Sequence, residues 1–203
     1  VKGKRKCSTS KRKKVFEMLS QEQDPKGEIT KSLSLLLEPA SEKGVGFLQE
    51  DYEDDTKDSS QWMYLPALKK MKKIVSASTD GPKTGSFFGS ELSYEDMEKR
   101  HETDYTYKGM GEESIKGRTT FIIEMTPTKK QYSKTSYGKS KVWIDKESLI
   151  TVKSELFDKQ DKLAKTFVAR GLTKVSGIWT TKMQIVVNHK TKRMSMMKVG
   201  TVK

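Results

Sequence analysis

The sequence predicts a mainly β protein whose antiparallel strands form a strongly curved sheet. Apolar and polar residues alternate in many segments, turn-forming residues separate these segments at short intervals, and helical periodicity is weak. Short connections make successive strands antiparallel. Because one side of such strands is apolar, the sheet must cover that side by forming a sandwich, by closing towards a barrel, or by wrapping around a helix or a ligand.

Alternation is clearest in the second half of the chain. In residues 118–127, Phe121, Ile123 and Met125 share one face, which we expect to be buried, and Ile122 lies on the other. Further strands are expected at residues 141–144, 149–157, 163–171 and 179–188, and polar turns separate the first three of these.

The first half shows weaker strand patterns. A turn containing Pro25 and Gly27 separates the first two of three expected strands, which lie within residues 13–20, 29–40 and 45–55. Helical patterns are scarce. The best candidate is residues 90–101, where Ser90 or Ser93 can cap a first turn that carries acidic residues. Residues 64–74 are expected to be a strand and a turn, since Pro66 interrupts the run.

The formal net charge of +13 is typical of nucleic-acid-binding proteins, but its distribution weakens that hypothesis. Eight of the first fourteen residues are Lys or Arg, so much of the excess lies in one terminal segment. The aromatic residues Trp62, Tyr64, Phe121, Trp143 and Trp179 fall within apolar patterns, which favours a core or cavity lining over base stacking. We therefore expect no nucleic-acid partner.

The residues required for catalysis or metal binding are scarce. The two histidines, His101 and His189, lie in charged or turn-like stretches, and the one cysteine, Cys7, is expected to be a free thiol. An EF-hand counted from Asp51 would need a glycine where Thr56 stands and a glutamate where Trp62 stands. The sequence predicts no enzymatic activity, no metal site and no cofactor.

Two blocks carry a more specific signal, QWMYLPALKKMKKI at residues 61–74 and GSFFGSELSYEDM at residues 85–97. They resemble the LolA-like family of outer-membrane lipoprotein-sorting proteins, in which the corresponding patterns are W-x-Y-L-P-A-L-K-[KR]-x-[KR]-[KR]-I and G-S-x-[FL]-S-Y-E-D-[LM]. The later segments VWIDKES and GIWTTKMQIVVNHK also fit, although Thr181 stands where the family pattern has proline.

This resemblance implies a single domain over residues 1–203, folded as an incomplete β-barrel with a helical lid and an apolar cavity between sheet and lid. The family's export signal and first helix would precede Val1. The implied function is that of a non-enzymatic periplasmic carrier, which binds lipoprotein acyl chains or another lipid and delivers it toward the outer membrane. The implied partners are an inner-membrane transporter and an outer-membrane acceptor.

We assign the expected cavity lining to apolar residues on the alternating segments, with methionines suited to chains of variable shape. The predicted lining residues are Leu35, Leu37, Phe47, Trp62, Tyr64, Leu65, Leu68, Phe121, Ile123, Trp143, Met183, Ile185 and Val187. The predicted lid residues are Phe87, Phe88, Leu92 and Tyr94.

Two alternatives remain open from the sequence. The same fold can serve as a sensor that binds lipid or lipoprotein and signals through a protein contact. The lysines of KKMKK, residues 69–73, favour contact with an anionic membrane surface, although a solvated charged face is the simpler interpretation.

Overall fold

The computed structural model describes residues 12–21, 26–76 and 81–200. The chain forms two compact units, Val1–Val75 and Ser76–Lys203. Each contains one antiparallel sheet, and the predicted mainly β fold that is not closed into a barrel is confirmed. The strands form two sheets instead of the one expected from the sequence, because residues 74–104 contain no strand among those described. Cys7 and Pro25 lie outside the described residues.

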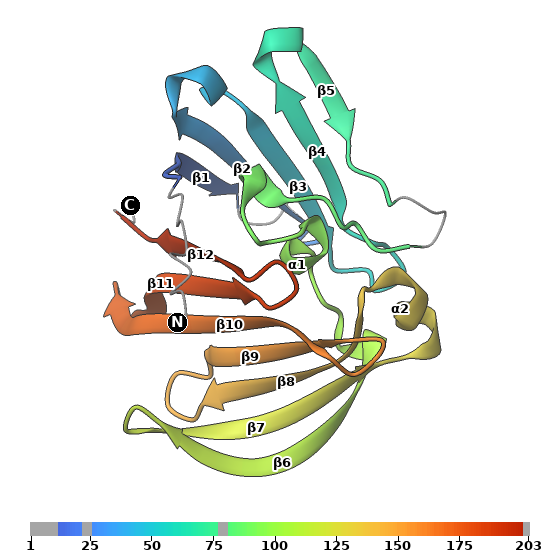
Figure 1. The fold of residues 1–203 in the computed structure, drawn as a ribbon, viewed down its shortest axis with the longest axis vertical. Helices are drawn as coiled ribbons and strands as arrows, with labels where there is room; N and C mark the ends of the chain where they lie inside the picture. The colour runs from blue at the N-terminus through green and yellow to red at the C-terminus, as the bar shows by residue number, and fades with distance from the viewer. Residues whose placement is uncertain (1–11, 22–25, 77–80, 201–203) are drawn as a thin grey trace, which may run out of the picture. The chain divides into compact units, whose positions relative to one another are not determined.

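The first unit is a five-stranded sheet in which neighbours in sequence are neighbours in space (Figure 1). Its strands are β1 (Val15–Gln21), β2 (Ile29–Glu38), β3 (Gly46–Tyr52), β4 (Ser60–Leu65) and β5 (Lys70–Lys73). The 3-10 turns η1 (Ala40–Glu42) and η2 (Pro66–Leu68) join β2 to β3 and β4 to β5. Pro66 begins η2, where its fixed φ is favourable, and Lys69 closes it in the left-handed region at φ 50°.

The second unit is a seven-stranded sheet with the order β12-β11-β10-β9-β8-β7-β6 (Figure 1). Its strands are β6 (Tyr105–Ile115), β7 (Arg118–Pro127), β8 (Tyr137–Asp145), β9 (Thr151–Asp158), β10 (Leu163–Val175), β11 (Ile178–Asn188) and β12 (Arg193–Lys198). Its short helical elements are η3 (Phe87–Gly89), α1 (Tyr94–Met97), η4 (Glu102–Asp104) and α2 (Lys129–Lys134). The long edge strand β6 carries a bulge at Gly109–Gly111, with Gly111 at φ 95°.

The expected strands all occur, but one expected face is wrong. Phe121 is 39% exposed, whereas Ile122 on the opposite face is 9% exposed. Ile122 packs with Trp143, Val152 and Ile115, so this face of β7 forms a hydrophobic cluster. A second cluster on the other face joins Tyr137, Leu156 and Ala164, with Phe167 packed against it.

We expect Leu156→Ala to lower the free energy of unfolding by about 2–5 kcal/mol, because the Leu156 side chain is 2% exposed and its removal leaves a cavity. Urea denaturation followed by tryptophan fluorescence measures this change. Ile178→Ala is the matched control, since Ile178 is 72% exposed and should contribute little. Equal losses in the two variants would contradict the assignment of Leu156 to the core.

Candidate functional site

The first sheet has two faces of opposite character. Side chains alternate along each strand, and the cross-strand register therefore assigns every described residue to a face. On one face, here called the Leu33 face, register aligns Leu33, Leu48, Trp62 and Lys73 across β2 to β5. The neighbouring row of the same face is Leu35, Gly46, Tyr64 and Met71.

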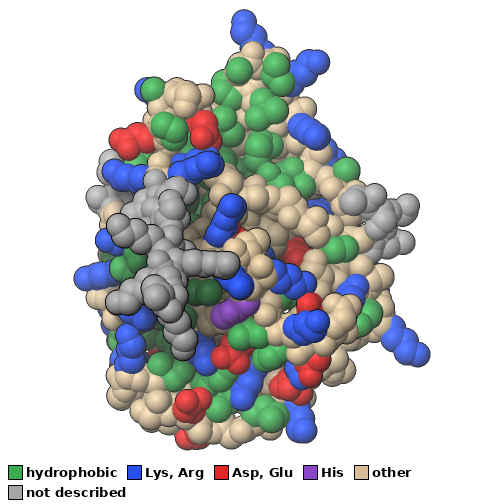
Figure 2. All heavy atoms as spheres, in the orientation of Figure 1, with side chains coloured by type: hydrophobic (Ala, Val, Ile, Leu, Met, Phe, Trp, Pro, Cys, Tyr) green, Lys and Arg blue, Asp and Glu red, His purple; other side chains and the backbone are tan. Residues whose placement is uncertain are grey.

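The Leu33 face is apolar yet accessible to solvent. Its leucines and Trp62 are only partly buried, Tyr64 is 39% exposed, and Met71 is 63% exposed. In the view of Figure 2, hydrophobic side chains reach the surface over the first sheet, with Lys and Arg side chains near them. Gly46 lets Leu35 pack closely over its backbone, because a Cβ there would lie 3.2 Å from Leu35 Cδ2.

The opposite face, called the Leu36 face, is buried although it carries many polar residues. Leu36 and Phe47 lie there beside the buried side chains of Ser34, Gln49 and Gln61. The polar groups are hydrogen-bonded in a chain: Gln61 Nε2 donates to Gln49 Oε1 at 2.8 Å, and Gln49 Nε2 donates to Asp51 Oδ2 at 2.9 Å. The first sheet thus buries a partly polar face and leaves an apolar face accessible, the reverse of the usual arrangement.

The second sheet also has two distinct faces. The row Ile123, Val142, Ser154, Phe167, Val186 and Ser195 crosses β7 to β12 on one face, called the Ile123 face. The row Ile122, Trp143, Lys153, Val168, Ile185 and Met196 crosses the other, called the Trp143 face. The Trp143 indole is 3% exposed, lies 3.9 Å from the Lys153 ammonium and donates a hydrogen bond to Glu113 at 2.7 Å, so charged side chains partner the buried cluster on this face.

A segment called the strap, residues 81–98, crosses one end of the Ile123 face. It contains η3 and α1, so the helix predicted within residues 90–101 occurs only over Tyr94–Met97, and Ser93 is its N-cap. Glu91 accepts hydrogen bonds from Asn188 Nδ2 at 2.8 Å and Thr191 Oγ1 at 2.9 Å, and its backbone N–H donates to Ser195 Oγ. Glu95 accepts from the backbone N–H of Ser136 at 2.9 Å. The strap is therefore fixed to strands far from it in sequence.

A buried ion pair anchors the centre of the strap. Lys165 Nζ contacts Asp96 Oδ2 and donates to Ser93 Oγ at 3.0 Å, while the Tyr137 hydroxyl donates to Asp96 Oδ1 at 2.7 Å. The Asp96 side chain is fully buried and that of Lys165 is 11% exposed. Burial raises the pKa of the Tyr137 hydroxyl above its usual range, which keeps it protonated as a donor. Burial also raises the pKa of the Glu95 carboxyl.

The predicted lining residues divide between faces. Leu35, Leu37, Trp62 and Tyr64 lie on the Leu33 face, whereas Phe47 and Leu65 lie on the Leu36 face. Leu68 is in η2 and is 63% exposed.

In the second sheet, Phe121 and Ile123 lie on the Ile123 face, and Trp143, Met183, Ile185 and Val187 lie on the Trp143 face. Sequence reasoning missed Leu33 and Leu48, which the alternation through Leu35 and Trp62 identifies once the register is known. The lid residues Phe87, Phe88 and Leu92 are buried and Tyr94 is partly buried. Their role as a lid stays a prediction.

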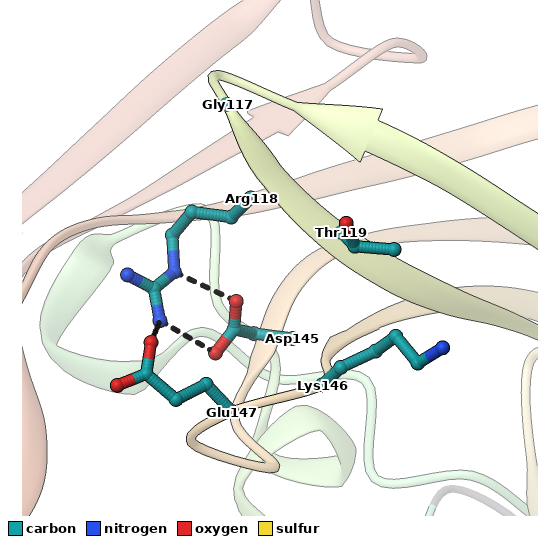
Figure 3. A pocket seen from close by; sticks show the side chains of 6 residues that line it. All are labelled: Gly117, Arg118, Thr119, Asp145, Lys146 and Glu147. Atoms are coloured by element: carbon teal, nitrogen blue, oxygen red, sulfur yellow. Dashed lines mark hydrogen bonds and ion pairs between the residues drawn. The ribbon is translucent and has the colours of Figure 1, made fainter.

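A polar pocket of about 380 Å³ lies between the β6–β7 and β8–β9 turns of the second unit. Arg118 donates to Asp145 Oδ1 at 2.7 Å, to Asp145 Oδ2 at 2.8 Å and to Glu147 at 2.9 Å (Figure 3). Lys146 points away from the guanidinium and pairs with Glu112 at 2.7 Å. Because these charges neutralise one another, the cluster fastens two turns together and leaves little unbalanced charge for a ligand.

Chemical groups for catalysis are sparse in the described part of the chain. No set of three His, Cys, Asp or Glu residues there is arranged to hold a metal ion. The described helices include none that is both long and apolar enough to cross a membrane. The apolar faces are therefore the most distinctive candidate site in these residues.

We expect Lys165→Met to lower the free energy of unfolding by about 3–5 kcal/mol, because Asp96 would remain buried without its counter-charge. Urea denaturation gives this value, and limited proteolysis within residues 81–98 reports release of the strap. Lys57→Met is the control, since Lys57 is 60% exposed and its partner Asp54 is 44% exposed, so this ion pair lies at the surface. The double variant Lys165→Met/Asp96→Asn should regain part of the loss, and unchanged stability in Lys165→Met alone would refute the anchor.

The Arg118–Asp145 contact predicts a pH dependence. Hydrogen bonds from Arg118 and Ser148 hold the pKa of Asp145 well below its usual range. A lowered carboxyl pKa contributes stability that is complete above the unfolded pKa of about 4 and is lost as the pH falls towards the folded value. Asp145→Asn should therefore be less stable at pH 7 and show a shallower decline below pH 4 in pH-resolved unfolding experiments. Asp161→Asn, at an exposed ion pair, should follow the wild type, and parallel curves for Asp145→Asn would disprove the linkage.

Comparisons with known proteins agree with the fold. A family model whose description reads "-like: Uncharacterized protein" matches residues 28–203. No curated protein sequence matches the chain. A DUF1329 family protein from Desulfovibrio piger is 29% identical, with a TM-score of 0.80, over 90% of this chain and 74% of that one.

Two further solved structures share the fold. A structure from Vibrio parahaemolyticus described as a "putative outer membrane lipoprotein-sorting protein domain" is 26% identical, with a TM-score of 0.76, over 94% of this chain and 79% of that one. A LolA superfamily protein from Nitrosomonas europaea shares the fold at 18% identity and a TM-score of 0.57, over 86% of this chain and 77% of that one. The chain therefore belongs to the family that the matching model describes, and its fold is LolA-like.

Proposed function

We propose that this protein is a non-enzymatic periplasmic carrier that binds lipoprotein acyl chains or another lipid and delivers it toward the outer membrane. The observation that carries the proposal is the reversed first sheet, whose apolar Leu33 face is accessible while its partly polar Leu36 face is buried. An accessible apolar sheet face is costly in water unless an apolar partner covers it at some stage of function.

The energetics of lipid transfer favour such a partner. Burial of hydrocarbon is worth about 0.8 kcal/mol per methylene, so a sixteen-carbon chain needs roughly 12 kcal/mol of apolar burial to leave a membrane. The Leu33 face offers Leu33, Leu35, Leu48, Trp62 and Met71 for this purpose. Met71 supplies a flexible thioether, which adapts to chains of variable shape.

The family relationship supports the same function. Similarity to an outer membrane lipoprotein-sorting protein over most of both chains makes lipid or lipoprotein binding the first expectation for this fold. In a periplasmic route the donor would be an inner-membrane transporter and the recipient an outer-membrane acceptor. Lys69 and the lysines of β5 would favour approach to an anionic membrane surface.

We expect Leu33→Gln and Leu48→Gln each to weaken binding of a fluorescent acyl probe about tenfold or more, because burying a leucine side chain is worth about 1.5–3 kcal/mol. Titration of the probe measures the dissociation constant, and native mass spectrometry measures lipid that copurifies with the protein. Leu149→Gln is the matched control, since Leu149 is 71% exposed in the β8–β9 turn of the other unit. A wild-type protein that retains no lipid and binds no acyl probe would overturn the proposed function.

A further inference from the structure

Lys73 brings a positive charge onto the apolar Leu33 face. Alternation in β5 places Lys73 and Met71 on this face, opposite Trp62 and Tyr64, and directs Lys70 and Lys72 to the other. Two further charged residues lie on the Leu33 face, Lys31 on β2 and Glu50 on β3. They neutralise each other, because Lys31 Nζ lies 3.2 Å from Glu50 Oε1. Among the described residues, no acidic side chain lies within ion-pair distance of Lys73.

The position of Lys73 is defined by an aromatic contact. Its ammonium stands 5.7 Å from the centroid of the Trp62 ring. From Lys73 the row continues through Trp62 and Leu48 to Leu33, which is three interstrand steps or about 14 Å of apolar surface. The face therefore presents an apolar track that begins at a cation.

A neutral hydrocarbon covering this track would remove water from Lys73 without supplying a counter-charge, which is unfavourable. A molecule with an acidic group at one end of its chain would supply both the apolar contact and the charge. The arrangement thus distinguishes ligands by their head group as well as by their chain.

We propose that the Leu33 face takes an anionic amphiphile, whose carboxylate or phosphate group pairs with Lys73 and whose hydrocarbon chain lies along the Trp62, Leu48 and Leu33 row. This inference rests on the proposed lipid-binding function and adds the class of ligand. Trp62 contributes apolar surface beside the charged group and holds the Lys73 ammonium near it.

Three probes with the same sixteen-carbon chain test the proposal: hexadecanoate, hexadecyl phosphate and hexadecanol. They are titrated against the full chain, and against Lys73→Gln, Lys73→Arg and Lys72→Gln, by competition with a fluorescent acyl probe below the micelle concentration. Lys72 is the matched control because it is adjacent, has the same charge, and lies on the opposite face. Circular dichroism confirms that each variant is folded.

We expect the wild type to prefer the two anionic probes over hexadecanol, and Lys73→Gln to weaken anionic binding about fivefold, as for one lysine near an anionic group. Lys73→Arg should retain the preference, and Lys72→Gln should match the wild type. A stronger effect for hexadecanoate or for hexadecyl phosphate identifies a fatty acid or a phospholipid as the source of the acidic group.

Two results would overturn this inference while leaving the proposed function intact. The first is equal binding of hexadecanol and the anionic probes with no effect of Lys73→Gln. The second is an equal loss for Lys73→Gln and Lys72→Gln, which would indicate general attraction to positive charge. Failure of all three probes to bind the wild type would instead remove the proposed function, and this inference with it.

Discussion

Cross-strand register is the constraint on which both faces of the first sheet depend. A slip of one residue between β3 and β4 would exchange the faces of the β4 side chains, bringing Gln61 to the accessible side and Trp62 to the buried one. The hydrogen-bonded chain from Gln61 through Gln49 to Asp51 opposes such a slip, since its members would lose their partners in a buried environment. The buried polar residues thereby specify which apolar residues remain accessible.

In the second unit, buried polar contacts likewise fix the structure, but they join residues that are far apart in the sequence. The strap is held by polar groups that reach β10, β11 and β12 together with the start of β8. The block GSELSYEDM, which in the sequence carried the family resemblance, supplies these contacts through Glu91, Ser93, Glu95 and Asp96. The motif that carried the family resemblance thus has a structural role, because its polar residues hold the strap against the second sheet.

The sequence predicted most strands of both sheets because their signal is local, but it missed β6 and β12, the two edge strands of the second sheet. It failed on the face of β7, where Phe121, Ile122 and Ile123 are all apolar and alternation cannot choose between them. Residues predicted to share a lining were also divided, because alternation within one strand does not fix its pairing with the next, as for Ile123 and Trp143. Helix α2 was missed because it is short and has no apolar period.

The candidate site was predictable only in part for a related reason. Alternation in β2 and β4 identifies Leu35 and Trp62, but their relation to Leu48 depends on the pairing of separate strands. The anchor of the strap joins Asp96 to Lys165, which are 69 residues apart, and no local pattern links two such residues. Side chains that are brought together by contacts between distant residues can be identified only once the fold is known.

The bulge in edge strand β6 has a consequence for the behaviour of the protein at high concentration. An intact eleven-residue edge would offer a second molecule a continuous ladder of backbone donors and acceptors. The extra residue at Gly109–Gly111 interrupts that ladder and shifts its register. An incoming strand could therefore pair with β6 on only one side of the bulge. One inserted residue therefore disfavours edge-to-edge polymerisation, a property that matters in a crowded compartment.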